Sequence, residues 1–242
     1  MTGEFEWFNQ DQKERDYLQR LLLREVYKNS GKDTVFKGGT ALQKVYGLGR
    51  FSDDLDFALN NRDALLRIDE SLESFGTNVC EIVNDFESER IIEKARVLYR
   101  IAALHPESKE IRTITIDVSY EHTLLEPDAA PVSAGGDSFL VYVMARSEIL
   151  AEKIRAIFDE ERNKARDLYD LWFLIRGGTD IDISLISKKL GRAGQKYSFG
   201  RLQARIRTLG NHWEELTPLM DKPPSYGIVA KDVIDAFRYL EA

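Results

Sequence analysis

The chain has 242 residues, of which 43% are hydrophobic and 31% charged, and its net charge of −7 argues against a general nucleic-acid binder. This composition excludes a disordered or fibrous chain, apolar runs such as Leu171–Ile175 are too short to span a membrane, and Met1–Trp7 lacks the apolar segment of a signal peptide. Cys80 is the only cysteine, which excludes internal disulfides and a thiolate metal site, so we expect a cytoplasmic protein with no membrane partner.

The first part of the chain predicts a mixture of helices and strands. Leucines at helical spacing indicate an amphipathic N-terminal helix, and alternation of apolar and polar residues indicates the strands. The segment Glu121–Ser138 has two prolines and a glycine pair, so we expect a loop there. The predicted helices are Asp11–Asn29, Ala41–Tyr46 and Ala64–Phe75, and the predicted strands are Thr34–Phe36, Phe51–Leu59, Val79–Phe86, Ala95–Leu104, Ile111–Tyr120 and Val141–Met144.

The rest of the chain predicts helices alone. We therefore expect an α+β fold, with a strand-rich domain at residues 1–144 that opens with a helix and a helical domain at residues 145–242. The predicted helices of the second domain are Ser147–Glu160, Ala165–Ile175, Ile183–Leu190, Phe199–Leu209 and Val229–Leu240.

Charge is distributed unevenly between these two parts. Residues 1–142 hold 17 basic and 26 acidic residues, whereas the remainder holds 17 basic and 15 acidic residues. Such a basic part suits contact with phosphate groups, although a solvated helical face explains it equally well. Between Ile183 and His212 there is no acidic residue, and the seven basic ones are Lys188, Lys189, Arg192, Lys196, Arg201, Arg205 and Arg207.

A glycine pair separates the first predicted strand from the next predicted helix. Gly38 and Gly39 would let backbone amides approach a phosphate, the helix start would add unpaired N–H groups, and Thr40 would add a hydroxyl donor. Paired glycines in a turn more often serve only the geometry of the chain.

Paired carboxylates give a sharper signal. Asp54 and Asp56 fall on one face of the predicted strand Phe51–Leu59, roughly 7 Å apart, and carboxylate oxygens suit Mg²⁺. Two metal ions about 4 Å apart could clamp the attacking and leaving oxygens of a phosphoryl transfer. The alternative is a solvent-facing strand edge. The parity of Asp53 places it with the apolar residues, so we assign it to the start of the strand.

Asp117 supplies a third carboxylate from a separate predicted strand. It could complete a metal site or accept a proton from an attacking hydroxyl, or it could be an ordinary exposed strand residue.

The helical part contributes a lysine and two further acids. Lys153 lies in or beside the apolar stripe of its helix, where a lysine should extend to solvent or meet an anion, either a triphosphate or a neighbouring aspartate. Asp167 and Asp170 share one helix face, and Arg166 could pair with Asp170.

Together these segments strongly resemble the AbiEii/AbiGii-type toxin family of nucleotidyltransferases, within the DNA polymerase β-like superfamily. The resemblance rests on FKGGTAL at residues 36–42 and RFSDDLDF at residues 50–57. It continues in SEILAEKIRA at residues 147–156 and in KARDLYDL at residues 164–171.

The resemblance implies a mixed β-sheet flanked by helices, followed by a helical region that completes the active site. It also implies a nucleoside triphosphate substrate and one or two Mg²⁺ ions. Carried over by position, Gly38, Gly39 and Thr40 would hold phosphates, and Asp54 and Asp56, with Asp117, would bind metal. Lys153 would contact the nucleotide phosphates, and Asp167, with Asp170, would orient Lys153 or an acceptor hydroxyl. Since 14 residues separate Gly39 from Asp54, slightly more than in the superfamily pattern, Asp53 is the alternative first metal ligand.

The expected function is that of a toxin that transfers a nucleotidyl group to an acceptor hydroxyl, in a toxin–antitoxin or phage-defence system. Some members of the family modify the acceptor end of tRNA, so RNA is the expected acceptor and a separately encoded antitoxin the expected partner. The alternatives are transfer to a small molecule or a protein, and a nucleotide-binding module without catalysis.

Overall fold

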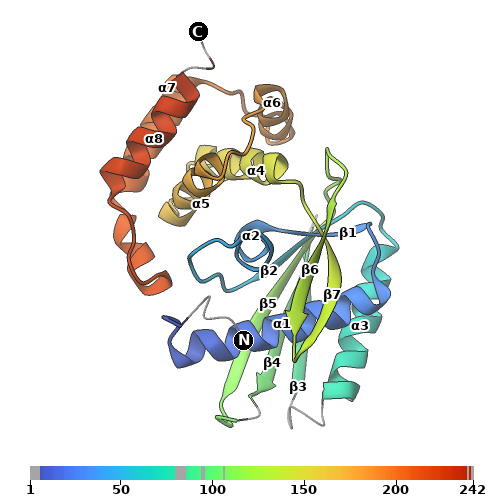
Figure 1. Cartoon of the computed structure of the whole chain (residues 1–242). Helices are drawn as coiled ribbons and strands as arrows, with labels where there is room; N and C mark the ends of the chain where they lie inside the picture. The colour runs from blue at the N-terminus through green and yellow to red at the C-terminus, as the bar shows by residue number, and fades with distance from the viewer. Residues whose placement is uncertain (1–5, 80–85, 94–95, 106, 239, 241–242) are drawn as a thin grey trace. The chain divides into compact units, whose positions relative to one another are not determined.

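A computed structural model gives the fold of the chain and describes residues 6–79, 86–93, 96–105, 107–238 and 240 (Figure 1). Its internal contacts divide the chain into two compact units. Unit 1 comprises Met1–Gly47 and Phe51–Met144, and unit 2 comprises Leu48–Arg50 and Ala145–Ala242. The division into one domain at residues 1–144 and another at residues 145–242 stays a prediction.

Unit 1 is built on a seven-stranded mixed sheet with the order β3-β4-β5-β2-β1-β7-β6. Two of its strand pairs, β2 with β5 and β1 with β7, are parallel, and the other pairs are antiparallel. The predicted mixed sheet flanked by helices is therefore confirmed. The strands are β1 (Thr34–Lys37), β2 (Leu55–Leu59), β3 (Phe86–Glu93), β4 (Arg96–Leu104), β5 (Ile111–Ser119), β6 (Asp128–Ala134) and β7 (Asp137–Val143).

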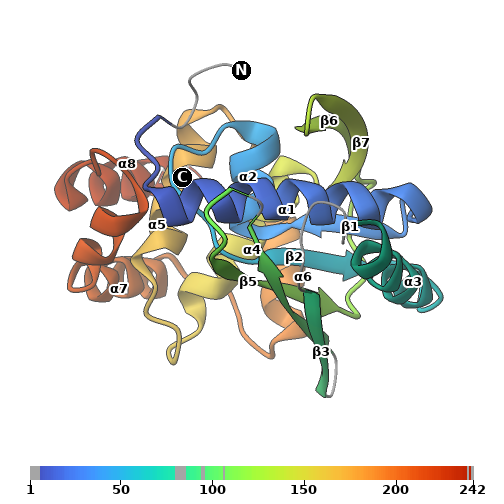
Figure 2. The same cartoon turned by 90° about the horizontal axis from the view of Figure 1, so that it is seen from below.

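The core of unit 1 lies between one face of this sheet and two helices. Helix α1 (Gln10–Asn29) runs along the sheet and packs against α3 (Ala64–Val79) and against β5, β6 and β7 (Figures 1 and 2). A capping box between Asn9 and Gln12 begins α1. On the central strands every second residue is buried in this core, so the intervening residues point to the opposite face of the sheet.

The strand predicted over Phe51–Leu59 begins only at Leu55. In the segment before Leu55, backbone N–H and C=O groups form hydrogen bonds with side chains instead of with a neighbouring strand. The Gln19 side chain donates to the carbonyls of Ser52 and Asp53, and the Ser52 N–H donates to the Gln43 side chain. Because these backbone groups already have partners, the segment stays a loop.

Of two other predictions for unit 1, the first falls mostly outside the described residues and the second is wrong. The expected strand Val79–Phe86 covers residues 80–85, with Cys80, which are not described; of its two ends, Val79 ends α3 and Phe86 begins β3. The expected loop at 121–138 contains β6 and the start of β7. Pro131 fits in β6 because β6 is an edge strand, which pairs with β7 alone.

Unit 2 consists of helices, as predicted. Helix α4 packs against α5, α6 and α7, and α5 packs against α8. The short 3₁₀ helix Trp213–Leu219 was not predicted from the sequence. None of the helices among the described residues is long and apolar enough to cross a membrane. The helices are α4 (Arg146–Phe158), α5 (Ala165–Arg176), α6 (Ile183–Arg192), α7 (Phe199–Gly210) and α8 (Tyr226–Arg238).

Candidate active site

A row of charged residues crosses the centre of the sheet in unit 1. Asp56 on β2 is the register partner of Asp117 on the parallel strand β5, and Lys37 on β1 is the antiparallel partner of Asp56. Their neighbours Phe36 and Phe57 lie in the core, so the row is on the opposite face. Adjacent strands are about 4.8 Å apart, and the two carboxylates therefore leave neighbouring positions of one face.

The start of α2 (Gly38–Tyr46) lies against this row. Gly38 has a φ of 78°, and a Cβ atom at this position would overlap the carboxylate of Asp56. Only glycine readily adopts this positive φ and also leaves room for the Asp56 carboxylate. The Asp56 carboxylate consequently lies at the N-terminal end of a helix, where the helix dipole favours negative charge.

Asp54 lies in the loop before β2, so the prediction that Asp54 and Asp56 share one strand face is wrong. The Thr40 hydroxyl donates a hydrogen bond to the backbone carbonyl of Asp54 and so ties this loop to α2. Phosphate binding by Gly38, Gly39 and Thr40, and metal binding by Asp54, stay predictions.

The donors in this row fit Mg²⁺. Proteins usually hold Mg²⁺ with one or two carboxylates, and substrate phosphates and water complete its coordination. Asp56 and Asp117 supply such a pair, although Arg96 Nη2 lies 3.4 Å from Asp117 Oδ2. Within the described part of the chain, no three acidic, histidine or cysteine side chains are grouped as a ready-made metal site. Further ligands would therefore come from the substrate, from water or from a shift of the Asp54 loop.

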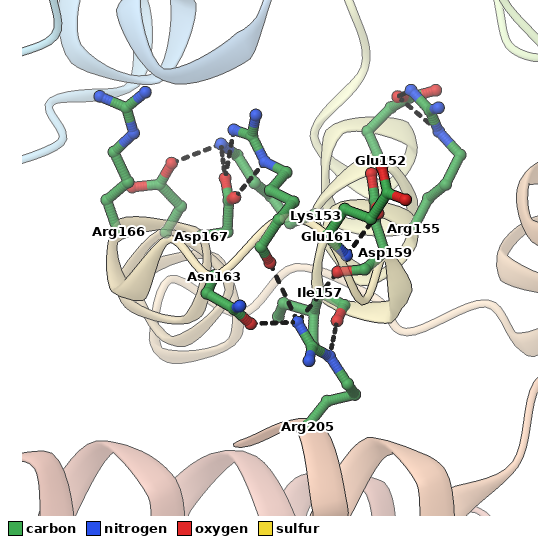
Figure 3. Close-up of polar contacts among 12 residues, drawn as sticks. Glu152, Lys153, Arg155, Ile157, Asp159, Glu161, Asn163, Arg166, Asp167 and Arg205 are labelled. Carbon is green, nitrogen blue, oxygen red and sulfur yellow. Dashed lines mark hydrogen bonds and ion pairs between the residues drawn. The ribbon is translucent and has the colours of Figure 1, made fainter. Parts of the chain in front are cut away.

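Unit 2 holds a second group of charges, which we call the Lys153 cluster: Arg50, Lys153, Arg162, Asp167 and Asp170. Lys153 Nζ lies 3.0 Å from Asp167 Oδ1 and 2.6 Å from Asp170 Oδ2. Of the two kinds of anion considered for Lys153, the structure therefore shows neighbouring aspartates, and Lys153 pairs with two of them. Figure 3 shows its contact with Asp167. A contact of Lys153 with a triphosphate stays a prediction.

The two arginines complete the cluster. The Arg50 guanidinium donates two parallel hydrogen bonds, of 2.6 and 2.7 Å, to the Asp170 carboxylate. Arg162 Nε donates to Asp167 Oδ2 at 2.7 Å. Asp170 therefore pairs with Arg50 and Lys153, and the predicted pair between Arg166 and Asp170 is wrong. No role was predicted for Arg50 or Arg162, although Arg50 opens the segment RFSDDLDF that carries the family resemblance.

Every member of the Lys153 cluster is expected to be charged. Burial acts to raise the pKa of Asp170 and of Asp167, but the adjacent cations more than offset it, so both pKa values are lowered. Burial acts to lower the pKa of Lys153, but Asp170 and Asp167 raise it above its ordinary value. Three cations and two carboxylates leave one net positive charge.

The basic stretch between Ile183 and His212 does not form one binding surface. Lys189 is fully buried, and its Nζ lies 2.8 Å from Glu148 Oε1 and 2.6 Å from Glu152 Oε1 on α4. Arg205 is 8% exposed and donates to oxygens of unit 2. Among these basic residues the exposed ones are Lys188, Arg192, Lys196 and Arg207.

Comparisons with known proteins identify the family of the chain. The family described as "Nucleotidyl transferase AbiEii toxin, Type IV TA system" matches residues 20–226. No curated protein matches the sequence.

Two solved structures from Helicobacter pylori share the fold. JHP933 is 21% identical, with a TM-score of 0.58 over 97% of this chain and 94% of its own. A second protein, assigned provisionally to the nucleotidyltransferases, is 23% identical, with a TM-score of 0.55 over 93% of this chain and 96% of its own. Because the family match extends over most of the sequence, the chain belongs to the AbiEii family of type IV toxin–antitoxin systems and is a nucleotidyltransferase.

Proposed function

We propose that this enzyme transfers a nucleotidyl group from a nucleoside triphosphate to an acceptor hydroxyl, in a reaction that depends on Mg²⁺, and that the acceptor is the 3′ end of tRNA. The observation that carries the proposal is the register of Asp56 with Asp117, beside a glycine that leaves room for the Asp56 carboxylate. The family suggests a cytoplasmic toxin that is restrained by a separately encoded antitoxin and that acts in phage defence.

Each group of residues has a part in this reaction. Asp56 and Asp117, with Asp54, would hold Mg²⁺, which neutralises charge on the phosphates. The acceptor oxygen bonds to the α-phosphorus, the bond to the bridging oxygen breaks, and pyrophosphate leaves. Asp117 is the candidate to accept the hydroxyl proton. Gly38, Gly39 and Thr40 would position the phosphates.

In the same proposal the ammonium of Lys153 contacts the triphosphate. Asp167 and Asp170 hold this ammonium at 3.0 and 2.6 Å, and the cluster keeps one net positive charge. A cation held in place before the substrate binds stabilises developing negative charge without reorganising during the reaction. Asp170 thus takes part in nucleotide binding through Lys153.

The test is label transfer from each of the four α-³²P nucleoside triphosphates, in the presence of Mg²⁺ and total cellular RNA. We expect one triphosphate to label RNA of tRNA size, and Asp56→Asn to lower the rate by about 10³-fold or more, equal to about 4 kcal/mol. Asp53→Asn and Asp54→Asn are compared as a matched pair, because each removes one of two neighbouring carboxylates. Loss of activity in the Asp54 variant alone identifies Asp54 as the ligand.

Other outcomes separate the alternatives. Label on protein or on a small molecule, which resists ribonuclease, would keep the enzyme and remove RNA as the acceptor. Triphosphate binding with no labelled product would favour a nucleotide-binding module that does not catalyse. Near-wild-type turnover in Asp56→Asn would refute the proposed metal site.

A further inference from the structure

Arg205 on α7 is a buried cation that the proposed reaction does not use. It is 8% exposed, and its guanidinium is surrounded by oxygens of the α4–α5 region (Figure 3). Its Nε donates to the Ile157 carbonyl at 2.6 Å. Its Nη2 lies 2.9 Å from the Asp159 carbonyl, 3.0 Å from the Arg162 carbonyl and 3.0 Å from Asn163 Oδ1.

The partners of Arg205 are neutral. In the part of the chain that the structure describes, no carboxylate lies within ion-pair distance of its guanidinium. Burying a charge is costly unless hydrogen bonds compensate, and here backbone carbonyls do so at the C-terminal end of α4, where the helix dipole favours a cation. An arginine held in this way fixes the backbone that surrounds it.

The backbone that Arg205 fixes leads directly to the Lys153 cluster. The loop at residues 159–164 connects α4, which carries Lys153, to α5, which carries Asp167. Arg162 in this loop offers its carbonyl to Arg205 and its guanidinium to Asp167. Arg205 is therefore joined to Lys153 through two intermediate residues.

We propose that Arg205 is a positioning residue for nucleotidyl transfer. It holds the 159–164 loop so that Arg162 keeps its hydrogen bond to Asp167, and Asp167 in turn holds the Lys153 ammonium in place. This inference rests on the proposed function, because it gives Lys153 a role at the phosphates.

Arg201 offers a matched control on the same helix. It also reaches the end of α4, where its Nη2 donates to the Phe158 carbonyl at 3.0 Å and its guanidinium covers the Phe158 ring at 5.0 Å. The same guanidinium also donates to Glu160 Oε1 at 3.2 Å. No hydrogen bond or ion pair joins Arg201 to Arg162 or Asn163 among the described residues, so its removal leaves the Arg205 hydrogen bonds to the loop in place.

The experiment compares Arg205→Ala with Arg201→Ala at a temperature at which thermal unfolding shows both to be folded. Rates are measured against the concentration of the triphosphate that the wild type uses. We expect Arg205→Ala to lower kcat by about 10- to 100-fold, the size of effect that a small misplacement of a reacting group produces. Arg201→Ala should stay within about threefold of the wild type, below the tenfold change that 1.4 kcal/mol represents.

Three readouts separate positioning from general stability. Methylguanidinium should restore part of the activity of Arg205→Ala and none to Arg201→Ala. Arg205→Lys should retain part of the activity. In a double-mutant cycle, Arg205→Ala should add little to Arg162→Gln, because both act on Asp167.

Each outcome decides the proposal. If the wild type transfers label and Arg205→Ala behaves like Arg201→Ala, the positioning role is overturned while the proposed function stands. If the wild type transfers no label, the proposed function fails and the inference fails with it. Should Arg205→Ala not fold, Asn163→Ala removes a single contact of the same guanidinium, and an unchanged kcat in this variant would overturn the inference.

Discussion

Replacing Asp170 by asparagine would measure how strongly the Lys153 cluster stabilises unit 2. Asp170 is fully buried, accepts two hydrogen bonds from Arg50 and forms an ion pair with Lys153. Asparagine keeps the shape of the side chain and removes its charge, so no cavity forms. The cluster would then hold three cations and one carboxylate, with Arg50 only 1% exposed.

The expected cost follows from this burial. Removing one partner of a buried ion pair costs about 3–5 kcal/mol, because the remaining charge stays out of water. With a urea m-value of about 2–3 kcal/mol per M, the unfolding midpoint should fall by about 1–2 M. Tryptophan fluorescence, to which Trp172 on the same helix as Asp170 contributes, follows the transition, and far-UV circular dichroism checks it.

Asp167→Asn is the control, since Arg162 has a side chain that is 41% exposed and can turn to water, while Lys153 keeps its ion pair with Asp170. This variant should cost about 1–3 kcal/mol. A midpoint change of less than about 0.3 M for Asp170→Asn, under 1 kcal/mol at the same m-value, would refute the reasoning.

The pH dependence has a definite sign. The pKa of Asp170 is lowered because Arg50 and Lys153 outweigh the effect of burial. The unfolded chain, with an ordinary pKa of about 3.9, therefore binds this proton first as the pH falls. The stabilisation is fully present above that value and is lost below it. The wild type should exceed Asp170→Asn by a constant free energy of unfolding at neutral pH, and the difference should narrow below about pH 4.

Two further pairs of substitutions test other contacts. Gly38→Ala and Gly47→Ala both place alanine at a positive φ, at 78° and 76°, but only the first overlaps Asp56. We expect about 1 kcal/mol of destabilisation for Gly47→Ala and a larger loss, with loss of activity, for Gly38→Ala; equal unfolding midpoints would refute the close approach. Lys189→Ala should destabilise unit 2 by about 3–5 kcal/mol, whereas Lys188→Ala should leave stability unchanged, and equal midpoints in urea unfolding would contradict the burial of Lys189.

Local signals in the sequence predicted most helices and several strands. The spacing of leucines predicted α1 to within one residue, and the alternation in Ile111–Tyr120 predicted β5. Edge strand β6 was missed because Pro131 and the following glycine pair are typical of loops. The glycines in fact form the two-residue turn between β6 and β7, where Gly135 and Gly136 have φ values of 60° and 92°. Both values are those of a hairpin turn that matches the twist of the strands.

The candidate site shows where local signals end. The sequence indicated the residue types, but the pairing of Asp56 with Asp117 depends on β2 and β5 lying side by side in parallel. Sixty residues and two further strands separate them along the chain, and no local pattern sets that register. The position of Asp54 likewise depends on Gln19, a distant residue of α1 that satisfies the backbone of the loop before β2.

The basic stretch is a different case, because the sequence did contain a signal that separates its buried residues from its exposed ones. Lys189 is four residues after Leu185 and three after Ile186, so helical periodicity places it on the apolar stripe of α6, while Lys188 falls outside that stripe.

The same rule applies on α7. Arg205 is three residues after Leu202 and four before Leu209, within the buried stripe, whereas Arg207 is exposed. A count of charges treats these four residues alike. Their helical phase separates Lys189 and Arg205, which are buried and contact α4, from Lys188 and Arg207, which are exposed. The position of Lys153 on its helix was interpreted by the same argument. A basic segment in a helical region should therefore be divided by helical phase before any of it is assigned to RNA.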